Sequence, residues 1–213
     1  MDIENFGETP SAKPTHHPML PDDIRMLIVG QSGCGKTNLV VNLIIKYVSW
    51  FRLYVITTTP YQAIYDNLRD LPHAASSAKG SGSVIFYEPE EVDAAIFDEM
   101  PPMSLVIFDD YMMQKDQTLP RIVFSRGRHR SVNSIYISQK FTETDLVIRQ
   151  NANVLVMFNV DKKSRECVHN MYASADMELA DFKKIKLARR EFLAILRDAD
   201  RKKKFYLNFK KAL

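Results

Sequence analysis

Eight consecutive residues have the types and the spacing of a phosphate-binding loop. They are Gly30, Gln31, Ser32, Gly33, Cys34, Gly35, Lys36 and Thr37, and they match G-x-x-x-x-G-K-[ST] at every fixed position. We expect the three glycines to adopt positive φ, so that backbone amides can approach a phosphate. Lys36 should reach the β- and γ-phosphates, and the hydroxyl of Thr37 should bind Mg²⁺. The pattern therefore predicts a nucleotide site, with ATP and Mg²⁺ as its ligands.

A pair of acidic residues follows about 70 positions further along the chain. Four apolar residues, Leu105 to Phe108, end in Asp109 and Asp110. A buried strand would deliver Asp109 to the sheet edge that faces the phosphate loop, where its carboxylate can hold Mg²⁺. Asp110 could then polarise the attacking water as a general base. A solvated acidic turn would explain two acids taken alone, but their spacing from the glycine loop favours the metal and base roles.

Polar and basic residues surround a later strand, expected at 134–138. The strand ends at Gln139, whose amide can contact the γ-phosphate or the attacking water. The preceding run, residues 126–130, holds Arg126, Arg128 and Arg130. It could supply an arginine finger to a neighbouring subunit, contact the phosphates of a nucleic acid, or form a solvated basic loop. Arg149 is a second finger candidate, because we expect residues 149–153 to approach the same sheet edge.

Alternating strand-like and helix-like runs must position these residues. Strands are expected at 23–29, 53–57, 84–87, 104–110, 134–138 and 153–158, and helices at 36–48, 61–71, 89–100 and 161–187. The first strand is continuously apolar, as in parallel sheets that are covered on both faces. Strands at 191–196 and 204–209, around a turn at 198–200, predict an antiparallel hairpin. The fold class is therefore α/β: a P-loop NTPase core whose mainly parallel sheet is flanked by helices, with a C-terminal β-hairpin at the sheet edge.

The 213-residue length fits one such domain, which we place at residues 23–213. Residues 1–22 contain four prolines and few apolar residues, and they predict a flexible N-terminal arm. Only two cysteines are present, Cys34 and Cys167, so we expect a reducing compartment and no disulfide framework. No apolar run approaches the roughly 20 residues of a membrane span. We therefore expect a soluble protein with no transmembrane segment.

Positive charge is concentrated near the C-terminus. Residues 183–213 hold twelve Lys and Arg against three Asp and Glu, a net charge of +9, whereas the whole chain carries only +3. A localised basic surface suits a polyanion such as DNA, and a solvated basic face is the alternative.

Taken together, four motifs resemble those of one protein superfamily. They are the glycine loop, Phe108-Asp109-Asp110, the basic run that begins at Arg126, and Tyr136-Ile137-Ser138-Gln139. Over about residues 23–160 the chain resembles FtsK/HerA P-loop ATPases, and most of all the poxvirus-type genome-packaging ATPases of double-jelly-roll DNA viruses. The resemblance implies a homo-oligomeric ring, a pentamer or hexamer, that pumps double-stranded DNA into a viral capsid at a packaging vertex. It also implies localisation in the virion or at the site of virus assembly.

The resemblance also implies roles for individual residues. Lys36 and Thr37 match the phosphate and Mg²⁺ positions, Asp109 and Asp110 match the second motif, and Gln139 matches the sensor. The second acid is often Glu in cellular members, and Asp is a shorter base. The family's finger commonly precedes the sensor strand, which favours Arg126 or Arg128 over Arg149.

Other functions use the same loop. An ATPase for another DNA process, such as a helicase or a mobilisation protein, is barely separable from a packaging motor by sequence. A small-molecule or nucleotide kinase would need an acceptor pocket and a lid, and no arginine-rich lid is evident. A GTPase switch should carry N-K-x-D, which the sequence lacks.

Overall fold

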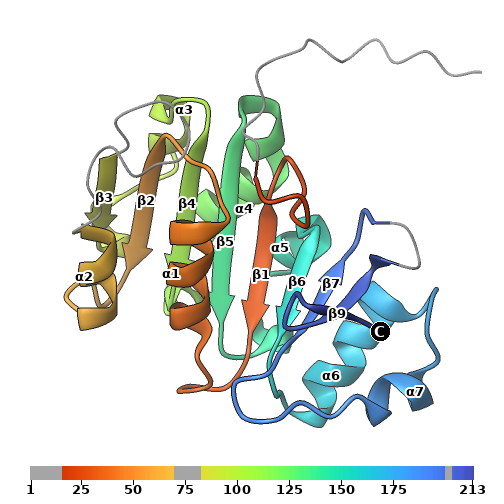
Figure 1. Ribbon diagram of the computed structural model, residues 1–213. Coiled ribbons are helices and arrows are strands. Elements are labelled where there is room, and N and C mark those ends of the chain that lie inside the picture. The colour runs from red at the N-terminus through yellow and green to blue at the C-terminus, as the bar shows by residue number, and fades with distance from the viewer. Residues whose placement is uncertain (1–15, 70–82, 200–202) are drawn as a thin grey trace, which may run out of the picture.

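The computed structural model describes residues 16–69, 83–199 and 203–213. Within these ranges nine strands form one sheet, in the order β3-β2-β4-β5-β1-β6-β7-β8-β9 (Figure 1). The parallel strands are β1 (Arg25–Val29), β2 (Arg52–Thr57), β3 (Ser83–Tyr87), β4 (Ser104–Asp109), β5 (Val132–Ser138) and β6 (Val154–Met157). The antiparallel strands are β7 (Leu193–Leu196), β8 (Phe205–Leu207) and β9 (Lys211–Ala212). The expected α/β class is confirmed, with its mainly parallel sheet and its C-terminal hairpin at the edge.

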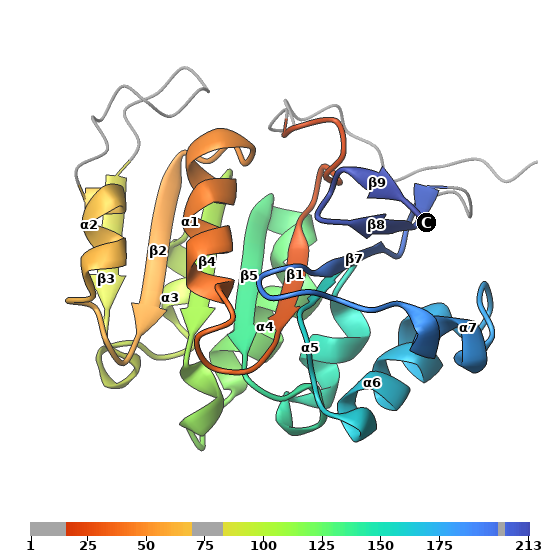
Figure 2. The ribbon, with the colours of Figure 1, turned by 60° about the horizontal axis from the view of Figure 1, so that its bottom comes forward.

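Helices cover both faces of the sheet (Figure 2). One face carries α1 (Lys36–Lys46) and α2 (Ala63–Arg69). The other carries α3 (Ile96–Glu99), α4 (Thr118–Arg126), α5 (Leu146–Asn151), α6 (Lys162–Val168) and α7 (Leu179–Lys184). A separate apolar core lies under each set of helices, as expected for strands that are buried on both sides. None of the helices in the described ranges is long and apolar enough to cross a membrane.

Helix α1 shows how the sequence pattern sets the packing around the site. Its residues Val40, Val41, Leu43 and Ile44 are buried against the sheet, whereas its exposed positions include Asn42. This spacing produces one apolar face on an α-helix. The burial fixes α1, and hence the phosphate loop that leads into it, against β1.

Two helices expected from sequence are interrupted. The segment expected to be helical at 89–100 contains a 3₁₀ turn, Pro89–Glu91, and the short α3. Glu88 and Glu91 cap that turn reciprocally, Val92 is extended, and Asp93 accepts a hydrogen bond from the Ala95 amide. These local side-chain bonds compete with a continuous helix. Likewise, the expected helix at 161–187 contains α6, a π-helical turn at His169–Ala173, and α7.

Residues 16–22 pack against the end of α1, which differs from the flexible arm expected over residues 1–22. The His17 amide donates to the Tyr47 carbonyl at 2.9 Å, and the Ser49 amide donates to Nδ1 of His16 at 3.0 Å. Met19 and Leu20 extend the apolar core beneath them. The His16 imidazole thus accepts a hydrogen bond from a backbone amide that follows the end of α1. Residues 1–15 and Asp200 of the expected turn lie outside the described residues, as do residues 72–82 of a loop that the sequence predicts at 72–83. Ser83 is instead the first residue of β3.

Candidate nucleotide site

The sheet brings the predicted site residues to one edge. Gly30 follows the carboxyl end of β1, Asp109 ends β4, and Gln139 follows β5. Because these strands are parallel and β5 lies between β4 and β1, their carboxyl ends adjoin. A cavity of about 280 Å³ lies there. It is lined by Ser32, Gly33, Gly35, Lys36, Thr37, Asn38, Gln62, Ile64, Asp109, Asp110 and Gln139.

The three loop glycines have different structural roles. Gly33 has φ 73° and Gly35 has φ 105°, as expected for a loop that turns its amides toward an anion. The expectation of positive φ at Gly30 was wrong. Gly30 is required because of close approach: a Cβ atom there would lie 2.6 Å from Cβ of Phe158 and 2.8 Å from Sγ of Cys34. Cys34 is half-buried, and this burial raises the pKa of its thiol.

Lys36 is held inside the loop. Its Nζ donates to the carbonyl oxygens of Gly30 at 2.7 Å and Gln31 at 3.0 Å, and the residue is only 8% exposed. From this position an ammonium group can pair with the oxygens of a phosphate that the loop binds. The lysine side chain therefore also helps to fix the shape of the loop.

Asp109 is buried beside Thr37, as the sequence predicted. Thr37 Oγ1 donates to Asp109 Oδ2 at 3.4 Å, and the hydroxyl of Tyr65 donates to the same oxygen. Burial raises the pKa of Asp109, whereas the Tyr65 hydrogen bond opposes that rise. A buried carboxylate and a hydroxyl are hard oxygen ligands, and Mg²⁺ in nucleotide sites is held by one or two carboxylates plus phosphates. The pair therefore fits Mg²⁺.

No cluster of three or more His, Cys, Asp or Glu side chains able to hold a metal exists within residues 16–69, 83–199 and 203–213. Mg²⁺ usually takes its remaining ligands from substrate phosphates and water.

Asp110 and Gln139 contact each other at the cavity. Gln139 Nε2 donates to Asp110 Oδ1 at 3.3 Å, although the two residues are far apart in sequence. Asp110 has φ 53°, a left-handed conformation that Asp tolerates better than most residues. This turn carries the second acid beyond the strand end, so that Asp109 faces Thr37 while Asp110 faces Gln139.

Three residues at this edge were not identified from sequence as part of the site. Tyr65 of α2 is fully buried and binds Asp109, yet its position reads as an ordinary core residue. Gln62 lines the cavity and donates to Thr59 Oγ1 at 2.6 Å. Arg190 lies beside Gly35: its Cγ would be 3.9 Å from a Cβ atom there. In sequence it was only one member of the basic segment.

The candidate arginine fingers lie at the opposite edge of the sheet. Arg126 and Arg128 precede β5, so they are next to the amino ends of the strands, far from the loop of their own chain. Both are exposed. Arg130 instead pairs with Asp98 at 2.8 Å and covers the ring of Phe97.

Arg149 does not approach the phosphate-loop edge, contrary to expectation. It precedes β6, so it too lies at the amino ends of the strands, because parallel strands begin at one edge. Its guanidinium packs over Phe141 at 5.2 Å, and its Nε is buried without a hydrogen-bond partner among the described residues. Packing of this kind suits a structural arginine better than a finger.

Comparison with known families gives one match over most of the chain. The model of the family described as Poxvirus A32 protein matches residues 13–210. A search of curated protein sequences finds no match.

Solved structures with a similar fold include viral and bacterial ATPases. The genome packaging NTPase B204 from Sulfolobus turreted icosahedral virus 2, in complex with ATP-gammaS, superposes with a TM-score of 0.58 at 15% identity. That match covers 90% of this chain and 98% of B204. EssC (ATPases 2 and 3) from Geobacillus thermodenitrificans gives 0.54 at 10% identity, over 81% of this chain and 37% of EssC. EccC from Thermomonospora curvata gives 0.51 at 14%, over 87% and 36% respectively. At these identities the likeness concerns the fold.

Proposed function

The chain belongs to the Poxvirus A32 protein family, and we propose that it is an ATP-hydrolysing motor that moves double-stranded DNA into a viral capsid. Membership in this family confirms the resemblance to poxvirus-type packaging ATPases that the sequence motifs indicated. The observation that carries the proposal is the meeting of two residue pairs at the phosphate loop, Thr37 with Asp109 and Gln139 with Asp110. The virion or the site of virus assembly would be its place of action.

The site residues suit hydrolysis of a bound nucleoside triphosphate. The loop amides and Lys36 would bind the phosphates, and Thr37 and Asp109 would hold Mg²⁺. Mg²⁺, when bound, neutralises charge on the β- and γ-phosphate oxygens. Asp110 would accept a proton from the attacking water, and Gln139 would orient Asp110 and that water. B204, whose fold is similar, is described in complex with ATP-gammaS and with AMPPCP, which supports ATP as the nucleotide.

Catalysis would be completed between subunits. Arg126 and Arg128 lie at the edge opposite to the loop of their own chain, so either could serve only the site of a neighbouring copy. In a closed ring each subunit presents one edge to the next, which suits a finger acting in trans. Such an arginine contributes about 10³–10⁵-fold to the rate. Arg126 forms no side-chain hydrogen bond or ion pair in the described part of the chain, and Arg128 contacts only the neighbouring His129 there, so both can reach outward.

DNA would bind through the basic C-terminal segment, although part of its charge is already paired. Lys183 pairs with Glu166, Lys184 with Asp181 and Lys204 with Asp176. Arg197 donates to the Gln150 carbonyl at 2.6 Å. The remaining exposed cations lie at both ends of the segment, and they include Lys186, Arg189, Lys210 and Lys211. Contacts from such side chains to phosphates do not read sequence, which suits a motor that must move any genome.

The ATPase rate per subunit, measured against protein concentration, tests this proposal. It should be followed with and without double-stranded DNA, at low and at high salt, with Lys36→Ala as the inactive control. A motor assembled from copies of this chain gives a rate that climbs with concentration and with DNA and falls with salt. A rate indifferent to both concentration and DNA would contradict the motor and favour a kinase. Empty capsids should be added in a separate measurement. An ATPase rate that DNA stimulates but that empty capsids do not change would favour an ATPase for another DNA process.

A further inference from the structure

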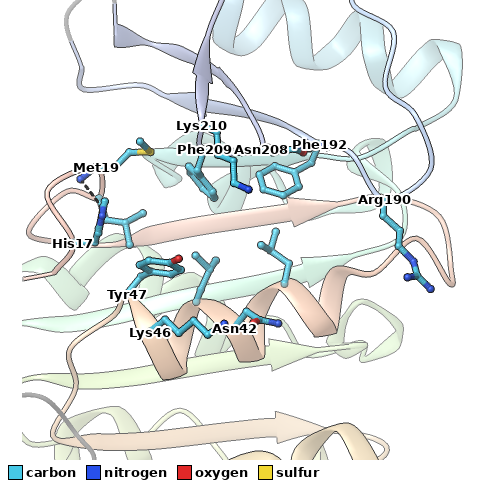
Figure 3. Close-up of a pocket in the computed structure, with 13 residues that line it drawn as sticks. His17, Met19, Asn42, Lys46, Tyr47, Arg190, Phe192, Asn208, Phe209 and Lys210 are labelled. Carbon is cyan, nitrogen blue, oxygen red and sulfur yellow. Dashed lines mark hydrogen bonds between the residues drawn. The ribbon is translucent and has the colours of Figure 1, made fainter.

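A groove of about 450 Å³ runs along α1, on the side facing the antiparallel strands (Figure 3). One wall is α1, and the other is formed by residues just before β7 and by the turn between β8 and β9. Residues 17–20 close the end of the groove that lies away from the phosphate loop. It is lined by His17, Met19, Leu20, Leu39, Asn42, Leu43, Lys46, Tyr47, Arg190, Phe192, Asn208, Phe209 and Lys210. Its volume is that of a typical small-molecule site.

The groove combines apolar and aromatic walls with three basic residues, in contrast to the cavity beside Asp109. Leu39 and Leu43 of α1 line it. Phe192 and Phe209 lie on the opposite wall (Figure 3). The two phenyl rings pack edge to face, with 5.3 Å between their centroids. Among the described residues no carboxylate lines the groove, whereas Asp109 and Asp110 line the phosphate cavity. The two hollows therefore suit chemically different groups.

The two hollows meet at the start of α1. Gly35 and Asn38 line the phosphate cavity, whereas Leu39 lines the groove. Arg190 stands at the end of the groove nearest to that point (Figure 3), and its Cγ would be 3.9 Å from a Cβ atom at Gly35. The antiparallel register of β7, with Leu193 opposite Met157, returns Arg190 to the phosphate-loop edge. A ligand seated on the loop therefore reaches Arg190 first when it enters the groove.

Strained backbone is concentrated around this groove. Six non-glycine residues in the described ranges have positive φ, and three of them line the groove: Arg190 (69°), Asn208 (54°) and Phe209 (56°). Such conformations persist where the surrounding structure imposes them, and they gather at ligand-binding sites. Here the Phe192 backbone amide donates to Asn208 Oδ1, and the Asn208 backbone amide donates to the Phe192 carbonyl, each at 3.0 Å. These bonds hold Phe192 in the wall of the groove.

We propose that the end of the groove beside the phosphate loop binds the nucleoside half of the nucleotide, with Arg190 covering the base. The inference rests on the proposed function. A nucleoside triphosphate has one charged half and one largely apolar, aromatic half, and the two contiguous hollows have these two characters. The Arg190 guanidinium can stack on a base, and Leu39 and Phe192 supply apolar contact. The side-chain amides of Asn42 and Asn208 stand on opposite walls. Asn42 Nδ2 donates to Asn38, and Asn208 Oδ1 accepts from Phe192. Asn42 Oδ1 and Asn208 Nδ2 are therefore the groups that can meet the polar edges of the base or ribose.

Direct binding of ATP and of inorganic tripolyphosphate to the full chain tests the proposal, by calorimetry with Mg²⁺ present. Tripolyphosphate carries the charged half alone. We expect Arg190→Ala to weaken ATP binding by about tenfold while tripolyphosphate binding stays unchanged. Lys163→Ala removes an exposed positive charge on α6 and should leave both affinities as in the wild type. Lys46→Ala, at the far end of the groove, should also leave both unchanged.

Two results would overturn the proposal. One is ATP binding that Arg190→Ala does not alter. The other is an equal loss for both ligands, which would make Arg190 a phosphate contact. Failure of the proposed function would look different, because the wild-type protein would then bind neither ATP nor tripolyphosphate.

Discussion

The hydroxyl of Tyr65 and the hydroxyl of Thr37 both donate to one oxygen of Asp109, its Oδ2. Thr37 belongs to α1, Asp109 ends β4 and Tyr65 belongs to α2. Tyr65 packs edge to face against Phe86 of β3, with 5.6 Å between the ring centroids. The carboxylate that we assign to Mg²⁺ is therefore oriented by two helices on one face of the sheet, and Tyr65 links its position to the outer strands.

Tyr65→Phe should increase the Mg²⁺ concentration needed for half-maximal ATPase activity several-fold. The phenol stabilises the charged carboxylate, so its loss raises the pKa of Asp109 further and lets protons compete with the metal. The shift should therefore be larger at pH 6 than at pH 8. The free energy of unfolding should fall by about 1 kcal/mol. Tyr61→Phe, at an 87% exposed position, is the control, and an unchanged Mg²⁺ requirement would exclude this role for Tyr65.

Asp109→Asn should make the protein more resistant to heat at neutral pH when Mg²⁺ and nucleotide are absent. Burial raises the pKa of Asp109 above its ordinary value of 3.8, so the folded state binds the proton more tightly than the unfolded state does. The free energy of unfolding then falls as the pH rises from 3.8 through the raised pKa. Asparagine cannot ionise, so the variant should lack this fall. Thermal unfolding between pH 4 and pH 8 measures it, and a variant that melts below the wild type at pH 7.5 would contradict the account.

Asp110→Asn should abolish most hydrolysis and leave ATP binding nearly intact. The side chain faces Gln139 at the cavity and is separate from Thr37 and Asp109, to which we assign Mg²⁺. Loss of a general base typically costs about 10²–10⁴-fold in kcat. Single-turnover hydrolysis and equilibrium binding separate the two effects. Weak binding together with a normal kcat would mean that Asp110 is a ligand-positioning residue only.

Much of the site could be predicted from the sequence because parallel strands share one direction. Once residues 26–29, 105–108 and 134–138 are read as buried parallel strands, the residues that follow each strand must meet at one edge. Gly30, Asp109 and Gln139 follow from this rule, and the contact between Gln139 and Asp110 confirms it. The same rule should have placed Arg149 at the other edge, since it precedes a parallel strand.

Contacts between elements could not be predicted in this way. Tyr65 lies on the apolar face of a short helix, and no local pattern distinguishes a tyrosine that binds Asp109 from one that only fills the core. The requirement for glycine at position 30 comes from Phe158, which is distant in sequence. Arg190 reaches the phosphate loop only through the register of β7 with β6. These positions depend on tertiary packing, which periodicity does not specify.

The central claim is that ATP is hydrolysed between copies of this chain, and mixing of two inactive variants tests it most directly. Lys36→Ala lacks the phosphate lysine but keeps both arginines, whereas Arg126→Ala or Arg128→Ala keeps an intact loop. An equimolar mixture places an intact loop beside an intact arginine at about one quarter of the interfaces. We predict that activity returns when Lys36→Ala is mixed with one of these two arginine variants. A mixture of Lys36→Ala with Asp110→Asn is the control, because both substitutions damage the same site of a subunit, and it should stay inactive. Mixtures no more active than their separate components, for both arginines, would contradict hydrolysis in trans by this segment.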